Sequence, residues 1–261
     1  MGAAEPATLN TGDGLGDRDV ADEFTYSGEE LDSLGEARNY YEWISSRMAP
    51  WLGPRMVEAG AGIGTFTAFL LARRPDGHVT AVEPAANNFP RLERRWADDA
   101  RVTAVRGYLD DSLPAASADA VVAVNVMEHI EDDVGFLRAG ARVLAPGGRV
   151  CLFVPALPAL YGSLDRIFEH HRRYTRGMLD ARFREAGLEP VSIRYMNVPG
   201  MVAWWLWAKV LRRTTITARD AKTYDRWVVP LVRAVEDRVP MPVGNGLLAV
   251  ARKHDSNGGS R

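Results

Sequence analysis

The sequence predicts an α/β protein in which a parallel sheet is covered by helices on both faces. The first observation is that short apolar runs alternate with amphipathic segments between residues 55 and 154, as they do in βαβ units. The second is that the run at residues 120–124 is continuously apolar and rich in valine, which is typical of a strand buried on both faces. The third is a glycine-rich turn directly after the first apolar run.

The elements follow in order from these patterns. Strands are expected where short apolar runs lie between turn residues, at 55–59, 78–82, 102–105, 120–124, 149–154, 191–195 and 247–251. Helices are expected where apolar residues recur at helical spacing. The expected helices run from Glu29 until Pro50, from the glycine-rich turn to about residue 73, over 88–97, from Asp132 or Asp133 to 144, and from Thr175 to 186. Thr175 is the expected cap of the last of these helices. Pro146-Gly147-Gly148 is the expected turn before the strand at 149–154.

Residues 23–253 are expected to form one domain between a glycine-rich leader at 1–22 and a tail at 254–261. Two insertions interrupt the strand and helix alternation, an irregular, charge-dense one at about 155–175 and a mainly helical one at about 197–240. The second lies between the last two strands. We therefore expect a lid over the carboxyl edge of the sheet, where ligands bind in open α/β folds.

Composition narrows the class of protein. The 261 residues include 32 basic and 34 acidic side chains, and a net charge of −2 gives no bulk attraction to nucleic acid or to an anionic membrane. The single cysteine, Cys151, cannot form an intrachain disulfide and lies in an apolar run, so we expect a buried, inert thiol. No secretory signal is apparent, and the most apolar stretch contains Lys209. We expect a cytoplasmic protein without stable membrane insertion; its oligomeric state is open.

The glycine-rich turn carries the strongest functional signal. It contains Glu58, Gly60, Ala61, Gly62 and Gly64 in the pattern acidic-x-G-x-G-x-G. A nicotinamide or flavin site favours G-x-G-x-x-G, whose third glycine would fall on Thr65. The observed spacing resembles motif I of the S-adenosylmethionine (SAM)-dependent methyltransferases, whose cofactor has no phosphate.

Two further segments extend the resemblance to class I SAM-dependent methyltransferases. Glu83 ends the second strand, where a carboxylate can accept both ribose hydroxyls. The stretch from Val124 to Ile130 and the later Pro146-Gly147-Gly148 resemble the family's segments after its fourth strand, so the resemblance covers roughly residues 40–154. It implies SAM as the cofactor and a Rossmann-like, seven-stranded sheet whose last strand is antiparallel.

The same resemblance implies roles for particular residues. The loop from Gly60 to Gly64 and Asn125 would approach the methionine part of SAM, Glu58 would order the loop, and Tyr40 would close over the cofactor, as Tyr41 or Trp43 could. Relatives often carry, after the third strand, an aspartate that binds the adenine amino group. Tyr108 stands there instead, so the adenine contact would fall to the Leu109 backbone or to Asp110.

The insert at 155–175 is the expected methyl-acceptor site. It resembles a stretch of one bacterial subgroup that ends in His-x-Arg-Arg-Tyr-Thr. The expected catalytic residues are Glu169, His170 and His171. The expected substrate-binding residues are Tyr161, Arg172, Arg173, Tyr174 and, from the lid, Trp204. A solvated charged loop, with Asp165 and Glu169 at helical spacing, is the plainer interpretation.

The sequence leaves several activities open. Paired arginines fit a phosphate, and a tryptophan-rich lid fits an apolar tail or a carbocation. Together they favour C-methylation of a prenyl diphosphate in secondary, isoprenoid metabolism, resembling bacterial geranyl diphosphate methyltransferases, with Glu169 as the base and Mg²⁺ brought by the diphosphate. The alternatives are O- or N-methylation of a natural product with His170 or His171 as the base, and a non-catalytic SAM-binding scaffold.

Overall fold

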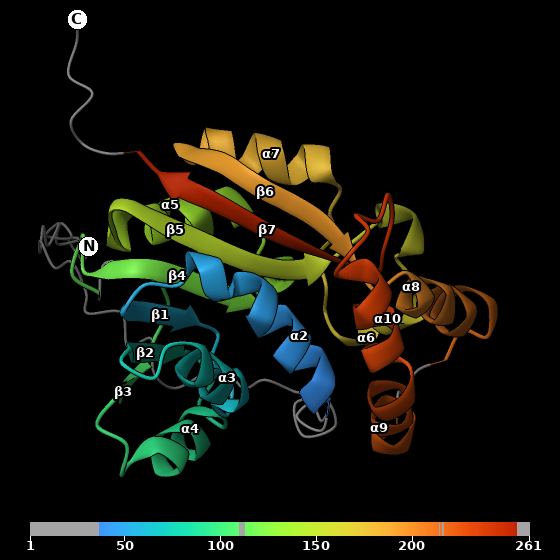
Figure 1. Ribbon diagram of the computed structural model, residues 1–261, viewed down its shortest axis with the longest axis horizontal. Helices are drawn as coiled ribbons and strands as arrows, with labels where there is room; N and C mark the ends of the chain where they lie inside the picture. The colour runs from blue at the N-terminus through green and yellow to red at the C-terminus, as the bar shows by residue number, and fades with distance from the viewer. Residues whose placement is uncertain (1–36, 110–112, 214, 216, 255–261) are drawn as a thin grey trace, which may run out of the picture.

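The computed structural model describes residues 37–109, 113–213, 215 and 217–254 (Figure 1). The expected leader, the first part of the helix expected from Glu29, Asp110 and most of the expected tail lie outside these residues. Within them, no helix is both long enough and apolar enough to cross a membrane.

A seven-stranded sheet with the order β3-β2-β1-β4-β5-β7-β6 forms the centre of the molecule. The strands are β1 (Arg55–Ala59), β2 (His78–Glu83), β3 (Val102–Arg106), β4 (Ala118–Val124), β5 (Leu144–Pro155), β6 (Leu188–Met196) and β7 (Gly246–Lys253). β1 pairs in parallel with β2 and β4, and the same direction continues through β3 and β5. β7 runs antiparallel to both β5 and β6, which confirms the expected fold class.

Helices cover both faces of the sheet. The α-helices are α2 (Arg38–Met48), α3 (Thr65–Arg73), α4 (Phe89–Trp96), α5 (Asp133–Val143), α6 (Ser163–Ile167), α7 (Arg176–Glu185), α8 (Val198–Trp204), α9 (Ala218–Trp227) and α10 (Val229–Glu236). A π-helix, η4 (Trp205–Val210), extends α8, and short 3-10 turns include η2 (Met127–His129) after β4. As expected, Asp132 accepts a hydrogen bond from Gly135 N and caps α5, and Thr175 accepts one from Met178 N and caps α7.

Two apolar cores lie on opposite faces of the sheet. One packs α5 and α7 against the strands through side chains such as Leu137 and Phe183. The other packs α2, α3, α4 and α10 against the second face, with Trp43 and Leu70 fully buried. Cys151 lies in this second core, and burial raises the pKa of its thiol to about 12, as expected of an inert cysteine.

The observed strands are longer than the expected ones near two irregular positions. β5 begins at Leu144, because Leu144 pairs with Ala118 while Arg149 pairs with Ala120. Pro146-Gly147-Gly148, expected as a turn before β5, therefore lies within the strand as a bulge between these two pairs, and Gly147 takes φ 71°. β6 starts before its expected first residue, with a similar register shift beside Pro190.

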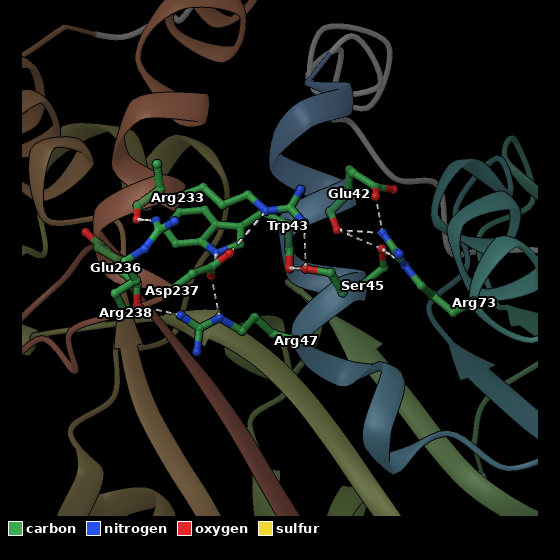
Figure 2. A network of polar contacts seen from close by, with 11 residues as sticks. Glu42, Trp43, Ser45, Arg47, Arg73, Arg233, Glu236, Asp237 and Arg238 are labelled. Carbon is green, nitrogen blue, oxygen red and sulfur yellow. Dashed lines mark hydrogen bonds and ion pairs between the residues drawn. The ribbon is translucent and has the colours of Figure 1, made fainter.

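Hydrogen bonds and an ion pair hold α2 between α10 and α3. Trp43 Nε1 and Arg47 Nε both donate to Asp237 Oδ1 beyond the end of α10, each at 2.9 Å (Figure 2). On the opposite side of α2, Arg73 of α3 forms an ion pair with Glu42. These contacts fix α2 across the sheet.

A side chain of α9 also contacts the first turn of α2. Asp225 of α9 is buried, and its carboxylate accepts hydrogen bonds from the backbone N–H groups of Asn39 at 3.0 Å and Tyr40 at 2.8 Å. An acidic side chain at a helix N-terminus satisfies donors that have no partner within the helix. Asp225 therefore positions Tyr40. In Figure 1, α8, α9 and α10 gather at the end of the sheet toward which β5 runs.

Candidate active site

A cavity of about 850 Å³ opens at the carboxyl ends of β1, β2 and β4. Its volume lies toward the upper end of the roughly 300–1,000 Å³ range of small-molecule sites. One part is lined by the glycine-rich loop and the ends of β2 and β3, and the other by η2, the segment after α6, and Trp204 of α8. The cavity has the size expected for a cofactor and a second small molecule.

The glycine-rich loop forms one wall of the cavity. Gly60 and Gly62 line it with φ of 67° and 57°, which side chains rarely tolerate. A Cβ on Gly60 would lie 2.6 Å from Val126 Cγ2, so glycine is also required by the close packing there. Gly64, predicted to bind cofactor, does not line the cavity. It packs against α4, where a Cβ would meet Trp96 Nε1 at 2.3 Å.

Glu83 joins this loop to the end of β2. Its Oε2 accepts a hydrogen bond from Gly62 N at 2.7 Å, and its Oε1 accepts one from Ala85 N at 2.9 Å. Burial raises the pKa of the carboxyl group despite these bonds. Each oxygen has a second lone pair, so the carboxylate facing the cavity can also accept bonds from ribose hydroxyls.

Glu58 supports the loop from behind. Its Oε2 accepts a hydrogen bond from the Thr67 hydroxyl at 2.5 Å, and burial raises the pKa of the carboxyl group to about 8. Glu58 and Ala61 line only a small adjoining void, and neither lines the main cavity. Glu58 therefore lies where the sequence places it, but neither residue is positioned for a direct cofactor contact.

The remaining expected cofactor residues that the structure describes do line the cavity. Tyr40 and Tyr41 approach from α2, and Asn125 follows β4 with φ 53°. Tyr108 and Leu109 lie after β3, and Tyr108 is 46% exposed at the edge of the cavity. These positions fit a cofactor held between β1, β2 and β4.

A carboxylate and two imidazoles meet in the other part of the cavity. Glu128 and His129 come from η2, and His170 comes from the segment after α6. Glu128 is fully buried, and among the described residues neither of its carboxylate oxygens has a hydrogen-bond partner. Burial raises its pKa to about 7. Burial, followed by the proximity of His170 and His171, lowers the pKa of His129 to about 4.

A second carboxylate positions His170. Asp165 Oδ1 accepts hydrogen bonds from Arg173 Nε at 2.6 Å and from His170 Nδ1 at 3.0 Å. Arg173 in turn lies with its guanidinium carbon 4.4 Å from the ring centroid of Trp204, whose Nε1 donates to Asp165 Oδ2 at 3.3 Å. Burial opposes ionisation of Asp165, but its bonds to His170 and Arg173 hold the pKa below the usual value.

Of the acceptor residues predicted from sequence, His170, His171, Arg173 and Trp204 line the cavity. Glu169 does not: α6 ends at Ile167, and Glu169 takes φ 56° in an exposed turn. Arg172 does not line the cavity either, because it is held by an ion pair with Asp133 at 2.9 Å.

Tyr161 and Tyr174 also serve the structure of the insert and do not line the cavity. The Tyr161 hydroxyl donates to the His170 carbonyl at 2.8 Å, and the buried Tyr174 hydroxyl donates to the Met127 carbonyl at 3.2 Å. Sequence reasoning missed Glu128 and His129. The available signal was their position, two polar residues shortly after a fully apolar strand.

Comparison with known proteins identifies the family. Residues 57–150 match a family model described as a methyltransferase domain. The chain is 30% identical over 199 residues to 27-O-demethylrifamycin SV methyltransferase of Amycolatopsis mediterranei (strain S699), covering 69% of this chain and 70% of the relative. It is 36% identical over 105 residues to a ubiquinone biosynthesis O-methyltransferase of Methylocella silvestris, covering 38% of this chain and 39% of the relative.

Solved structures share the fold at low sequence identity. Geranyl diphosphate C-methyltransferase from Streptomyces coelicolor A3(2) superposes with a TM-score of 0.61 at 17% identity, over 91% of this chain and 89% of the other. A putative sarcosine dimethylglycine methyltransferase from Galdieria sulphuraria gives 0.57 at 18% identity, over 83% and 86%. The sheet order, the glycine-rich loop and these likenesses agree, so the chain belongs to the class I SAM-dependent methyltransferases and is an enzyme that uses SAM.

Proposed function

We propose that this enzyme transfers the methyl group of SAM to a hydroxyl oxygen of a small, largely apolar acceptor. The observation that carries the proposal is the carboxylate of Glu128, which is fully buried in the cavity wall and unpartnered among the described residues. A neutral hydroxyl becomes a competent nucleophile when a positioned group takes up its proton. Glu128 lies in this cavity beside three imidazoles, those of His129, His170 and His171, and is the group that we assign to that task.

The cofactor half of the cavity fits SAM. Gly60 and Gly62 let the backbone approach the ligand, Glu83 faces the ribose position, and Tyr40 and Asn125 close the other sides. SAM, when bound, supplies an electrophilic methyl group. The contribution of these residues is to hold the cofactor with that group facing the acceptor, which is how positioning accelerates a displacement.

Large apolar side chains lie beside the polar cluster around Glu128 in the cavity wall. Ile130, Phe136, Phe153, Phe168 and Trp204 contribute to its walls. Such walls exclude water and favour a ring or a chain over a charged acceptor. Two relatives whose names specify O-methylation, of 27-O-demethylrifamycin SV and in ubiquinone biosynthesis, support oxygen as the acceptor atom.

C-methylation of geranyl diphosphate, with Mg²⁺ on the diphosphate, is the competing proposal. Of the features that favoured this substrate in the sequence, Trp204 lines the cavity, whereas Glu169 is exposed and Arg172 pairs with Asp133 outside the lining. Arg173 does line the cavity, but its charge is paired with Asp165. Glu128 could take the proton of a cationic carbon in place of Glu169, so the competing substrate belongs in the same assay.

The assay is mass-spectrometric detection of methylated product from SAM and a panel of phenols, aliphatic alcohols, amines and prenyl diphosphates, the last with Mg²⁺. We expect turnover on a hydroxyl compound. Loss of a general base typically costs a factor of ~10²–10⁴ in rate, so Glu128→Gln should lower kcat by that order while calorimetry shows unchanged SAM affinity.

The matched control is Glu169→Gln, the same chemical change at an exposed carboxylate that does not line the cavity. It should keep wild-type turnover. Turnover confined to prenyl diphosphates or amines would contradict O-methylation. Loss of activity in Glu169→Gln but not in Glu128→Gln would indicate that Glu169 is the base, as expected from the sequence.

A further inference from the structure

The cluster of Glu128, His129 and His170 has the composition of a metal site. Each side chain offers one ligand atom, and these atoms all lie within 4.8 Å of one another. Ligand atoms bound to one ion at ~2.0–2.2 Å lie roughly 3–4 Å apart, so modest side-chain rotations would close the set around an ion. The rings of His129 and His170 already lie edge to face, with centroids 4.9 Å apart.

The carboxylate of Glu128 needs a partner. Both of its oxygens are inaccessible to solvent and unbonded among the residues that the structure describes. A buried carboxylate without a hydrogen bond is costly, so such a group either binds something or takes up a proton. A cation in the cavity would satisfy it directly.

His170 is oriented as a ligand by a second carboxylate. Its Nδ1 lies 3.0 Å from Asp165 Oδ1, which leaves Nε2 as the nitrogen able to bind an ion. Metal-binding histidines commonly donate their other ring N–H to a carboxylate in this way, which fixes the tautomer and the ring plane. Asp165 is itself held by Arg173 and by Gly162 N at 2.9 Å, so this support is rigid.

The charges of the three buried groups leave room for a cation. The carboxylates of Glu128 and Asp165 face a single guanidinium, that of Arg173. The charges of Glu128, Asp165 and Arg173 sum to −1, and a divalent ion would raise the sum to +1. An acceptor oxygen that has lost its proton would then bring the total charge to zero. Two imidazoles and one carboxylate suit Mn²⁺, Fe²⁺, Co²⁺, Ni²⁺ or Zn²⁺ better than Mg²⁺ or Ca²⁺, which prefer oxygen ligands.

We propose that Glu128, His129 and His170 bind one divalent transition-metal ion in the acceptor half of the cavity, with Asp165 as the positioning residue of His170. Metal binding stands on the cluster alone, whereas its catalytic use rests on the proposed O-methylation. An ion there would hold the acceptor oxygen and lower the pKa of its hydroxyl, as bound cations do for water. With Glu128 bound to the ion, the exposed His171, which also lines the cavity, would take up the hydroxyl proton in its place.

The test is titration of the chelator-treated full-length protein with Co²⁺, followed by visible absorption, with bound Co²⁺, Mn²⁺ and Zn²⁺ counted by mass spectrometry after gel filtration. We expect one equivalent per chain and a cobalt band typical of nitrogen and oxygen ligands. Glu128→Gln and His129→Gln should each abolish the band, and Asp165→Asn should weaken binding ~10–100-fold. SAM affinity and the melting temperature show whether each variant is folded.

Two matched controls use the same substitutions away from the cluster. Glu169→Gln and His78→Gln, both at exposed positions, should bind Co²⁺ as the wild type does. Substoichiometric metal, or a band that survives both Glu128→Gln and His129→Gln, would overturn the proposal. A cobalt band without turnover on any hydroxyl compound would leave the site standing and contradict the proposed reaction instead.

Discussion

Glu83 Oε2 accepts a hydrogen bond from Gly62 N at 2.7 Å, so the residue expected to hold the ribose also holds the loop expected to hold the methionine part of the cofactor. The two contacts therefore depend on one carboxylate. Glu83→Ala should weaken SAM binding ~10–100-fold, since hydrogen bonds to a charged group contribute ~1.5–3 kcal/mol. Isothermal calorimetry measures the change, with Glu93→Ala on the exposed face of α4 as the control. Equal affinities for the two variants would contradict this role.

Glu58 should make the enzyme less stable as the pH rises. Its folded-state pKa is raised to about 8 from an ordinary value of 4.5. Between these values the folded protein keeps a proton that the unfolded chain has lost, so the free energy of unfolding falls with increasing pH, by up to ~1.4 kcal/mol per unit. Glu58→Gln removes this contribution. Urea unfolding from pH 5 to 8 should show a shallower fall for the variant, and identical slopes would refute the assignment.

Asp225 should couple the lid to cofactor binding. Its carboxylate accepts the N–H groups of Asn39 and Tyr40 at the start of α2. Loss of a capping side chain costs ~0.5–2 kcal/mol, so Asp225→Ala should lower the free energy of unfolding by that amount and raise the Kd for SAM, because Tyr40 is no longer held in place. Chemical denaturation and calorimetry test both effects. The control is Asp180→Ala, which removes a half-exposed carboxylate on α7. It should change neither the free energy of unfolding nor the Kd for SAM by a comparable amount.

The two adjacent arginines should behave differently. Arg173→Ala leaves the buried Asp165 without its counter-ion, and breaking a buried pair in this way costs ~3–5 kcal/mol. Arg172→Ala removes a partly exposed pair with Asp133, which Arg182 also contacts at 3.2 Å, so the loss should be much smaller. Guanidinium unfolding of the two variants gives the comparison. Similar destabilisation by both would contradict the assignment of Arg173 to the buried network.

The strands, the helical layers and the glycine-rich turn could be predicted because their signals are local, whereas the antiparallel last strand was implied by the family resemblance. A strand buried on both faces is continuously apolar, and glycines mark a tight turn that brings the backbone close to its neighbours. The position of Gly64 outside the cavity lining could not be predicted, because spacing alone does not distinguish a glycine that faces a ligand from one that packs against Trp96. The bulge at Gly147 depends on pairing with β4, which no local pattern reports.

The acceptor site could not be assembled from the sequence because its residues come from segments far apart in the chain. Glu128 follows β4, whereas His170 is brought beside it by the turn at Leu157 with φ 63° and by α6. An irregular insert has no helical or strand periodicity of apolar residues, so its sequence does not indicate which side chains face inward. Glu169 was therefore predicted as the base, although a left-handed turn exposes it to solvent. The buried carboxylate of Glu128 lies in the segment after β4, in which the sequence analysis assigned a role only to Asn125.

The most direct test of the central claim is transfer of a ¹³C-labelled methyl group from SAM to the acceptor panel, with the product examined by carbon NMR. We expect a methyl carbon bound to oxygen, formed by the wild type and by Glu169→Gln and lost in Glu128→Gln. A methyl carbon bound to carbon or nitrogen, or an O-methyl product that Glu128→Gln forms at the wild-type rate, would contradict it.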